Sequence, residues 1–520
     1  MNSTQKIGAF IRREWPTLLV IALGALLQLF LVLQPMNFLI QNLLPDDAFF
    51  YFQVARNIVH GFGSTFDTIN PTNGYHPLWM MICVAVYHFF PPVTSMDVTP
   101  IHILLLLQVA MNVVSAFLVA RILTRFSKSP WIRAFGIVVW TLNPYFLYET
   151  LNGLETSVAL MFFALFFLLA LRIEEGKKFG GYFFVGFIGS LMTLGRLDMG
   201  IFYFGAFGLW VLLRHGWRNG WKPVLLSAVG GFPIALWFVW NFVNFHMFLT
   251  SSSETEVMLN HALIIQDHGT SAIQTLKAIV YMTQYELNAF FARTGALAVL
   301  SGFIGAALLL FFQGRIELPR RARDVGAATA LFGGFLLLFI ANASIRWVGR
   351  SWYFVSIETF LAILVVVVCE RLFEKHLPYK KLIGLGLVGV MFFSFYVDWS
   401  KNLEPQKNPY GGQIVLQQMA LHLNTELPAG TLVGSFAPGI EGYFYNGHLV
   451  DLDGWINNSA AVAMQERQLW QYILNEKIGY ISVYGPTLTY RYIGFFGIDN
   501  IMSHLALVDD LVQIQTYQVH

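Results

Sequence analysis

Long runs of apolar residues alternate with short polar segments between Pro16 and Val397. An α-helix needs about 20 such residues to span a bilayer, and a shorter run can span where the bilayer thins. The pattern therefore predicts about eleven membrane-spanning helices, near residues 17–40, 102–124, 131–147, 157–172, 179–195, 199–214, 222–246, 295–313, 325–343, 352–371 and 381–397. The first run is too long for a signal-peptide core and lacks a small-residue cleavage site, so we expect a retained anchor.

Residues 77–90 (PLWMMICVAVYHFF) form an apolar run with the length of a re-entrant or interfacial segment. The positions of the Lys and Arg clusters indicate whether this segment crosses the membrane. If 77–90 does not cross, all the basic clusters fall on one side, at residues 12–13, 121–133, 177–178, 214–222, 315–323 and 375–381. The positive-inside rule then places that side, with the N-terminus, in the cytoplasm. Another short run could instead be the one that does not cross.

Three segments without a spanning run fall on the other, extracytoplasmic side. Residues 41–76 form a long polar first outer loop. Residues 247–294 contain SSSETE at 251–256 and a possible amphipathic helix near 273–291. The third segment is the tail, 399–520.

The tail has the pattern of a small α/β domain. Short apolar stretches at 431–436, 448–454 and 478–485 predict strands, and PGIEGYFY at 438–445 predicts the start of a helix. The expected fold class is therefore mainly α. A polytopic transmembrane helix bundle, residues 1–398, would carry a C-terminal α/β extracytoplasmic domain, residues 399–520.

Composition agrees with a membrane protein. The chain is 56% hydrophobic and only 12% charged, whereas soluble domains carry about 25% charged residues. A net charge of +2 gives no reason to expect a nucleic-acid partner. The two cysteines, Cys83 and Cys369, lie inside apolar runs and lack metal-ligand spacing, so neither a disulfide nor a metal site is expected from them.

The first outer loop opens with PDDAFFYF at 45–52. Pro45 and Asp46 suit the start of a helix, and Gly61 suits the position just past its end. The residues between them have the spacing of an amphipathic helix that lies at the membrane surface. Its apolar face would contain Ala48, Phe52, Ala55 and Val59, and its polar face would contain Gln53, Asn57 and His60. The turn-rich segment that follows, 61–77, must be folded by specific hydrogen bonds.

Asp46 and Asp47 stand together at the start of this helix. Adjacent carboxylates near hydrocarbon are costly unless they are paired, solvated or used. The simplest interpretation makes Asp46 a helix cap and Asp47 a favourable first-turn charge. A cap does not need two aspartates or a long polar loop behind them, which favours a functional role.

Further charged residues lie at helix ends on the same predicted side. They are Glu155 in NGLETS, Arg196 and Asp198 in LGRLDMG, and Arg346 and Arg350 in SIRWVGRSWYF. Singly, each is explained as a helix-end charge, a local ion pair or a snorkelling anchor. Together, carboxylates and arginines facing one membrane-level cavity would suit an anionic lipid head group and an acid/base reaction.

The stretch PDDAFFYFQVARNIVHGFGSTFDTINPTNGYHPLW at 45–79 is similar to the first-loop signature of bacterial members of the GT-C superfamily, which are integral membrane glycosyltransferases. The many spans and the outer C-terminal domain resemble that superfamily too. NGLETS, GRLDMG and GRSWYF at 349–354 are weaker matches to later motifs. One departure is Val355-Ser356, where such proteins often place a proline.

The resemblance implies transfer of a hexosyl or pentosyl group from a polyprenyl-phosphate-linked donor to a hydroxyl of a glycan, lipid or protein acceptor, at the outer face of the plasma (inner) membrane. It would make Asp46 the catalytic base, with Asp47 sharing that role or positioning the acceptor, and Glu155 completing the acidic site. Arg196 or Arg350 would hold the donor phosphate. The remaining substrate-binding residues would be His76, Asp198 and Tyr353. No cofactor is implied, because the donor carries no nucleotide.

Other functions fit the sequence less well. A transporter would need ionisable residues at mid-depth in its spans, which are nearly absent here. A membrane phosphatase would need a histidine nucleophile among several basic residues, and neither His60 nor His76 has such neighbours in sequence. The segment Asp451–Gly454 (DLDG) lacks the ligand spacing of a calcium loop. A non-catalytic scaffold with a partner-binding outer domain stays open.

Overall fold

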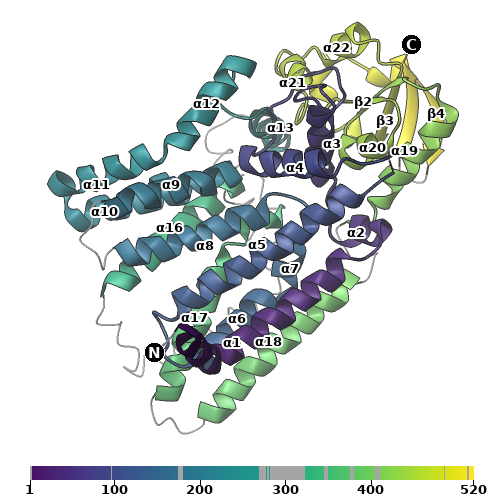
Figure 1. Ribbon diagram of the computed structural model, residues 1–520. Coiled ribbons are helices and arrows are strands. Elements are labelled where there is room, and N and C mark those ends of the chain that lie inside the picture. The colour runs from purple at the N-terminus through teal and green to yellow at the C-terminus, as the bar shows by residue number, and fades with distance from the viewer. Residues whose placement is uncertain are drawn as a thin grey trace.

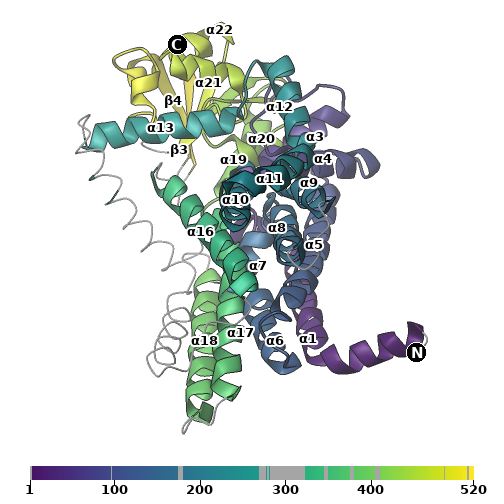
Figure 2. The same cartoon turned by 90° about the vertical axis from the view of Figure 1, so that its left-hand side faces the viewer.

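The computed structural model describes residues 3–94, 96–173, 180–268, 277, 280, 322–344, 350–374, 380–403, 410–484, 487–511 and 514–519. Within these ranges a bundle of apolar helices carries a small α/β domain at one end (Figure 1). The N-terminus lies toward the other end in both views (Figure 2). The expected combination of a helix bundle and a C-terminal α/β domain is therefore confirmed.

The expected spans within the described residues are all helical. They correspond to α1 (Ser3–Val32), α5 (Thr99–Leu123), α6 (Pro130–Thr141) with α7 (Pro144–Thr150), α8 (Thr156–Ile173), α9 (Gly180–Gly195), the π-helix η2 (Ile201–Phe207) with α10 (Gly208–His215), α11 (Trp217–Gly230) with α12 (Phe232–Phe245), α16 (Ala322–Ser344), α17 (Ile357–Glu374) and α18 (Lys380–Leu403). The expected span at 295–313 lies outside the described residues, and so does nearly all of the expected helix at 273–291.

Length and composition alone qualify four described helical segments to cross a membrane, namely Ile11–Val32, Thr99–Leu123, Thr156–Ile173 and Leu197–His215. The pair α11 and α12, bent by 52°, adds a fifth if it is one broken span. Shorter apolar helices, such as Gly180–Gly195 and Gly326–Asn342, accompany them. The protein is thus an integral multi-pass membrane protein, built partly from short and broken helices.

Some predicted spans have different boundaries or are broken. The first helix ends at Val32 instead of near residue 40, and α2 (Met36–Asn42) follows after Pro35. The span expected at 131–147 is divided into α6 and α7, because the Asn143 side chain accepts a hydrogen bond from the Tyr145 N–H and Pro144 starts a new helix.

The apolar segment 77–90 forms α4 (Pro77–Phe89), a short apolar helix of 13 residues. The ring of His102, at the start of α5, lies 3.3 Å from the carbonyl oxygen of Gln34, just past the end of α1. At the opposite end, Arg133 in α6 donates to Glu14 in α1 at 2.6 Å. Helices α1 and α5 are therefore antiparallel neighbours, and the chain from Gln34 to His102 leaves and returns at one end. That path agrees with a segment 77–90 that does not cross the membrane, which stays a prediction.

The helix expected in the first outer loop is α3 (Asp46–Val59); Gln53 and Asn57 of its predicted polar face are buried, whereas His60, at its C-terminal end, is exposed. Gln53 and Asn57 both donate to the carbonyl oxygen of Phe66 in the turn-rich segment. The carboxylate of Asp67 accepts from the N–H groups of Ile69 and Asn70 and so folds the turn itself. The loop is held by specific hydrogen bonds, as expected.

The C-terminal domain is a five-stranded mixed sheet in the order β2-β1-β3-β5-β4. Its strands are β1 (Leu432–Ser435), β2 (His448–Asp451), β3 (Tyr480–Tyr484), β4 (Leu505–Leu511) and β5 (Ile514–Val519). The first three were expected and are parallel, whereas β4 and β5 form an antiparallel extension that the sequence reading missed.

Helices cover both faces of this sheet. On one face α19 (Ile414–Glu426) and α20 (Pro438–Phe444) share a hydrophobic core with the first outer loop and the membrane helices. On the other face α21 (Asn458–Gln465) and α22 (Leu469–Asn475) form a separate core. Leu259 of α13 (Ser251–His268) packs into this second core, so α13 lies against the domain (Figure 2). The domain is therefore packed on the membrane part through α20 and held from the side by α13.

Candidate functional site

Two neighbouring cavities lie where the first outer loop, the helix ends and the C-terminal domain meet. The first cavity, of about 220 Å³, is lined by Asp47, Phe50, Tyr51, Gly74, Tyr75, His76, Leu154, Glu155, Leu197, Asp198, Ser252, Ser253, Glu256, Val257, Asn342, Trp352, Tyr353 and Trp455. The second cavity, of about 370 Å³, is lined by Asp46, Asp47, Phe50, Arg350, Gly412, Gln413, Leu416, Phe436, Ala437, Asp453, Trp455, Thr487, Arg491 and Tyr492. Asp47, Phe50 and Trp455 belong to both walls.

The predicted site residues divide between these cavities. Five of them, Asp47, His76, Glu155, Asp198 and Tyr353, line the first cavity, and Asp46 and Arg350 join Asp47 in the second. Arg196 lines neither cavity. Arg346 lies outside the described residues. Segments far apart in the sequence are thus brought together at one end of the bundle.

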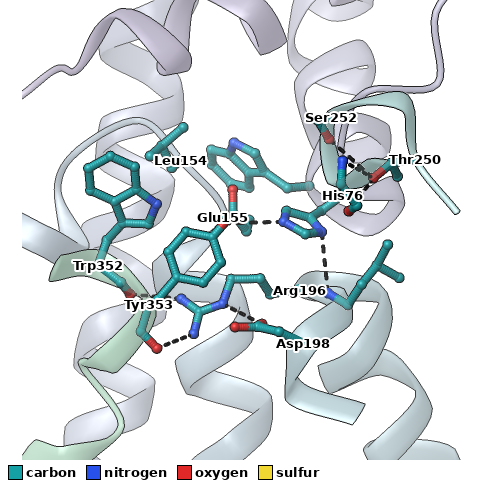
Figure 3. A network of polar contacts seen from close by, with 12 residues as sticks. His76, Leu154, Glu155, Arg196, Asp198, Thr250, Ser252, Trp352 and Tyr353 are labelled. Atoms are coloured by element: carbon teal, nitrogen blue, oxygen red, sulfur yellow. Dashed lines mark hydrogen bonds and ion pairs between the residues drawn. The ribbon is translucent and has the colours of Figure 1, made fainter. Parts of the chain in front are cut away.

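The side chains of His76 and Glu155 face each other (Figure 3), and Tyr51 joins them in a connected polar network. The Tyr51 hydroxyl donates to a Glu155 carboxylate oxygen at 3.0 Å and accepts from the His76 backbone N–H at 3.1 Å. The ring Nδ1 of His76 accepts from the Leu197 N–H at 3.2 Å, so a neutral ring carries its proton on Nε2, 3.7 Å from the other Glu155 oxygen.

Burial sets the protonation states of this network. It lowers the pKa of His76 to about 4, so the imidazole is neutral at physiological pH. It also raises the pKa of Glu155, partly countered by the nearby Arg196. His76 therefore presents an N–H donor to the first cavity and does not change its protonation state near neutral pH.

Arg196 is fully occupied by its own protein. Its guanidinium donates to Asp198 at 2.9 Å and to the carbonyl oxygens of Trp352 at 2.7 Å and Tyr353 at 2.5 Å. The side chain is only 1% exposed and lies 4.8 Å from the centre of the Tyr353 ring (Figure 3). Arg196 thus fixes the short helix η3 (Ser351–Phe354), which carries two residues of the first cavity.

Asp46 has a structural partner in the C-terminal domain. Its carboxylate accepts hydrogen bonds from the backbone N–H of Gly439 at 3.1 Å and of Ile440 at 2.7 Å, which are the first free donors of α20. Burial raises the pKa of Asp46 to about 7, although these hydrogen bonds favour the charged form. The prediction that Asp46 caps its own helix is wrong, because Pro45 is the N-cap of α3 and the Asp46 carboxylate binds the start of α20 instead.

Asp47 is the acid at the junction of the cavities. Its carboxylate lies 4.0 Å from Nη1 of Arg350, and both side chains are partly exposed, 19% and 31%. The Arg350 guanidinium lies 5.4 Å from the centre of the Trp352 ring and 5.7 Å from that of Trp455. A carboxylate that lines both cavities therefore lies beside a guanidinium that lines the second.

Several lining residues were not predicted from the sequence. Glu256 of α13 is 6% exposed, and one of its oxygens has no hydrogen-bond partner among the described residues. Burial raises the pKa of Glu256 to about 8. Glu256 belongs to the polar SSSETE segment, but nothing in the sequence indicated that this segment lies next to the first outer loop. Trp455 and Arg491 lie in the tail, where no motif was recognised.

The acidic residues do not assemble into a metal site in the part of the chain that is described. No group of three or more His, Cys, Asp or Glu side chains lies there in an arrangement that could hold a metal ion. In the DLDG loop, Asp451 accepts from the N–H groups of Asp453 and Ile456, and Asp453 accepts from that of Trp455. These carboxylates fold the turn. Cys83 and Cys369 are both free and buried.

The fold is similar to that of solved membrane enzymes. ArnT from Cupriavidus metallidurans, solved bound to undecaprenyl phosphate, matches with a TM-score of 0.58 and 12% identity over 96% of this chain and 97% of that chain. The oligosaccharyltransferase of Archaeoglobus fulgidus, tethered with an acceptor peptide, gives 0.56 and 12% over 94% and 71%. AglB from the same organism, with an inhibitory peptide and a dolichol-phosphate, gives 0.57 and 14% over 93% and 71%.

Sequence comparison adds little to this structural likeness. A domain of unknown function, DUF8728, matches residues 402–519, which is the C-terminal domain. No curated protein matches the chain. At these low identities the likeness concerns the fold alone, which is the fold of ArnT and AglB.

Proposed function

We propose that the protein is a membrane glycosyltransferase that moves a sugar from a polyprenyl-phosphate-linked donor to an acceptor hydroxyl. The observation that carries this proposal is the position of Asp47, which lines both cavities beside Arg350. In a transfer reaction the acceptor oxygen must lie next to the sugar carbon that it attacks, with a proton acceptor and a cation close to both. The donor sugar would occupy the first cavity, and the acceptor would occupy the second.

Asp47, rather than Asp46, is the general base in this proposal. Both carboxylate oxygens of Asp46 accept backbone hydrogen bonds from α20, and Asp46 does not line the first cavity. The carboxylate of Asp47 faces both. Glu155, oriented by Tyr51 and His76, would bind hydroxyl groups of the donor sugar from the opposite wall.

The chemical step needs a proton acceptor and a stabilised leaving group. Asp47 takes the proton of the acceptor hydroxyl, and the oxygen bonds to C1 of the sugar. The bond from C1 to the phosphate oxygen breaks, and the polyprenyl phosphate leaves with the electron pair. Arg350 stabilises the growing phosphate charge, whereas Arg196 holds the backbone of η3. A positioned base contributes roughly 10²–10⁴-fold.

The donor class is supported by the ligands of the structural neighbours. ArnT was solved with undecaprenyl phosphate and AglB with a dolichol-phosphate, and both share this fold. The same orientation by basic clusters would place the N-terminus in the cytoplasm and the site at the extracytoplasmic face of the inner membrane. In that orientation the donor lipid lies between helices while its head group enters the first cavity.

A pair of variants tests the proposal. Asp47→Asn and Asp46→Asn should be assayed in proteoliposomes with a panel of radiolabelled polyprenyl-phosphate sugars and glycan, lipid and peptide acceptors. We expect Asp47→Asn to lower transfer by about 10²-fold or more, because it removes the base. Asp46→Asn keeps one acceptor oxygen for α20 and loses the other, so it should lower stability, but transfer by the folded variant should stay within about threefold of the unmodified protein because the base is still present.

The pair separates the possible outcomes. If Asp46→Asn is the inactive variant and Asp47→Asn is not, the base is Asp46. If the folded protein and both variants transfer nothing from any donor on the panel, the glycosyltransferase proposal fails and a non-catalytic scaffold takes its place.

A further inference from the structure

The wall that the C-terminal domain contributes to the second cavity contains a cation, Arg491, that forms no ion pair with the described residues. The guanidinium of Arg491 lies 5.9 Å from the centre of the Trp455 ring and 5.5 Å from that of Tyr492. No ion pair joins Arg491 to a described residue, and its buried Nε has no hydrogen-bond partner there. Arg491 therefore offers charge and N–H donors to whatever enters the cavity.

The three acids that line the second cavity have other partners. Asp47 lies beside Arg350, and Asp46 is bound by the first N–H groups of α20. Asp453 accepts from the Trp455 N–H, and burial beside Asp451 raises its pKa, which favours its neutral form. Arg491 favours the charged forms of Asp453 and of Glu256 in the first cavity, but burial raises the pKa of both acids and neither forms an ion pair with Arg491 among the described residues.

A second atom of this cavity also needs a ligand. The side-chain oxygen of Gln413 is buried and has no hydrogen-bond partner in the described part of the chain. Buried acceptors in native proteins are nearly always paired. The cavity thus presents one unpaired acceptor and one unpaired cationic donor, on residues from opposite ends of the C-terminal domain sequence.

We infer that the second cavity binds an acceptor that carries an anionic group, phosphate or carboxylate, next to its hydroxyl groups. The anionic group pairs with Arg491, a hydroxyl donates to Gln413, and another hydroxyl lies at Asp47, where it receives the sugar. The roles of Arg491 and Gln413 rest on the proposed function only through this last contact. The inference gives the DUF8728 domain the task of selecting charged acceptors.

The first experiment measures binding without any transfer. Full-length protein in nanodiscs carrying Asp47→Asn, without donor, is titrated by equilibrium dialysis with radiolabelled glucose 6-phosphate, glucuronic acid and glucose. At least one of the two anionic sugars should bind at least tenfold more tightly than glucose, and the stronger of them identifies phosphate or carboxylate. Arg491→Gln should abolish this preference, and Arg491→Lys should keep most of it, since it preserves the charge.

The controls make failure readable. Arg467→Gln removes an exposed charge from the same domain and should leave the preference unchanged. Equal binding of all three sugars, or an anionic preference that survives Arg491→Gln in protein that stays folded, overturns the inference. If Arg491→Gln does not fold, loss of the preference in folded Arg491→Lys overturns it instead. Because no donor is present, a preference for anionic sugars stands even if no transfer is ever detected.

Discussion

At the scale of single residues, two arginines near the site, Arg196 and Arg350, have different roles. Arg196 donates to Asp198 and to two backbone carbonyl oxygens, whereas Arg350 lies at the cavity wall beside Asp47. The family resemblance implied that either one would hold the donor phosphate, and both lie at predicted helix ends. Only the folded chain distinguishes them, since the carbonyl oxygens that Arg196 binds are in a segment more than a hundred positions away.

Arg196→Lys is predicted to destabilise the protein although it keeps the charge. A lysine cannot reproduce the planar fork that reaches Asp198 and the carbonyl oxygens of Trp352 and Tyr353. Leaving buried acceptors unpaired costs about 2–4 kcal/mol. The midpoint of thermal unfolding in detergent should fall clearly, while Arg218→Lys, at an exposed position, should leave it unchanged. Equal midpoints for both variants would show that Arg196 is not a structural clamp.

The sequence located part of the candidate site and missed another part for a physical reason. Asp47, His76 and Glu155 could be found because they stand in polar segments next to apolar runs, where an unpaired charge is costly. Arg491, Trp455 and Glu256 stand in segments of ordinary water-facing composition. The sequence around these residues carries no signal of a site, and the residues that they contact in space depend on how the C-terminal domain packs on the first outer loop.

At the scale of elements, α20 joins the two halves of the molecule. Its first N–H groups bind Asp46, and the Arg56 guanidinium donates to the Tyr443 carbonyl oxygen and lies 4.5 Å from the centre of its ring. Glu441, on the same helix, is completely buried and accepts from the Ser435 hydroxyl at 2.9 Å. Burial raises the pKa of Glu441 to about 7.

The raised pKa of Glu441 predicts a pH-dependent stability. Because the folded state binds the proton more tightly, this contribution is complete below the ordinary pKa of 4.5 and is lost as pH rises through about 7. Glu441→Gln keeps an acceptor for Ser435 and cannot ionise. We expect the variant to gain on the order of 2–3 kcal/mol relative to the unmodified protein between pH 5 and pH 8. Thermal melts over this range measure it, and a difference that does not change with pH would contradict the assignment.

At the scale of the whole molecule, the C-terminal domain and the first outer loop touch directly through their backbones, at glycines that have no side chain to separate them. A Cβ on Gly439 would lie 2.1 Å from the backbone oxygen of Asp46, and one on Gly74 would lie 1.8 Å from that of Trp455. Glycine is needed at both positions because no side chain fits between the two backbones. These contacts fix the width of the cavities on either side of Asp47.

Gly439→Ala is predicted to loosen the C-terminal domain while leaving the membrane helices folded. Forcing a methyl group into such a contact costs about 1–3 kcal/mol, which corresponds to a rise of roughly 5- to 150-fold in the population with the domain undocked. Limited proteolysis of proteoliposomes should release a fragment that contains the domain correspondingly faster. Gly479→Ala, where a Cβ meets no atom within 4 Å, is the matched control. Equal cleavage of both variants would argue that the close contact does not hold the domain.

The hydrogen bond between Asp46 and Gly439 also has a consequence for how the protein is made. The two residues are 393 positions apart. At a translation rate of about 5–20 residues per second, α20 leaves the ribosome roughly 20–80 s after Asp46. During that time Asp46 lacks its partner, and the ring of Phe49, which packs against Tyr443 and Phe444 in the finished protein, is uncovered. The nascent first outer loop is therefore the part of the chain where quality control has the longest time to act.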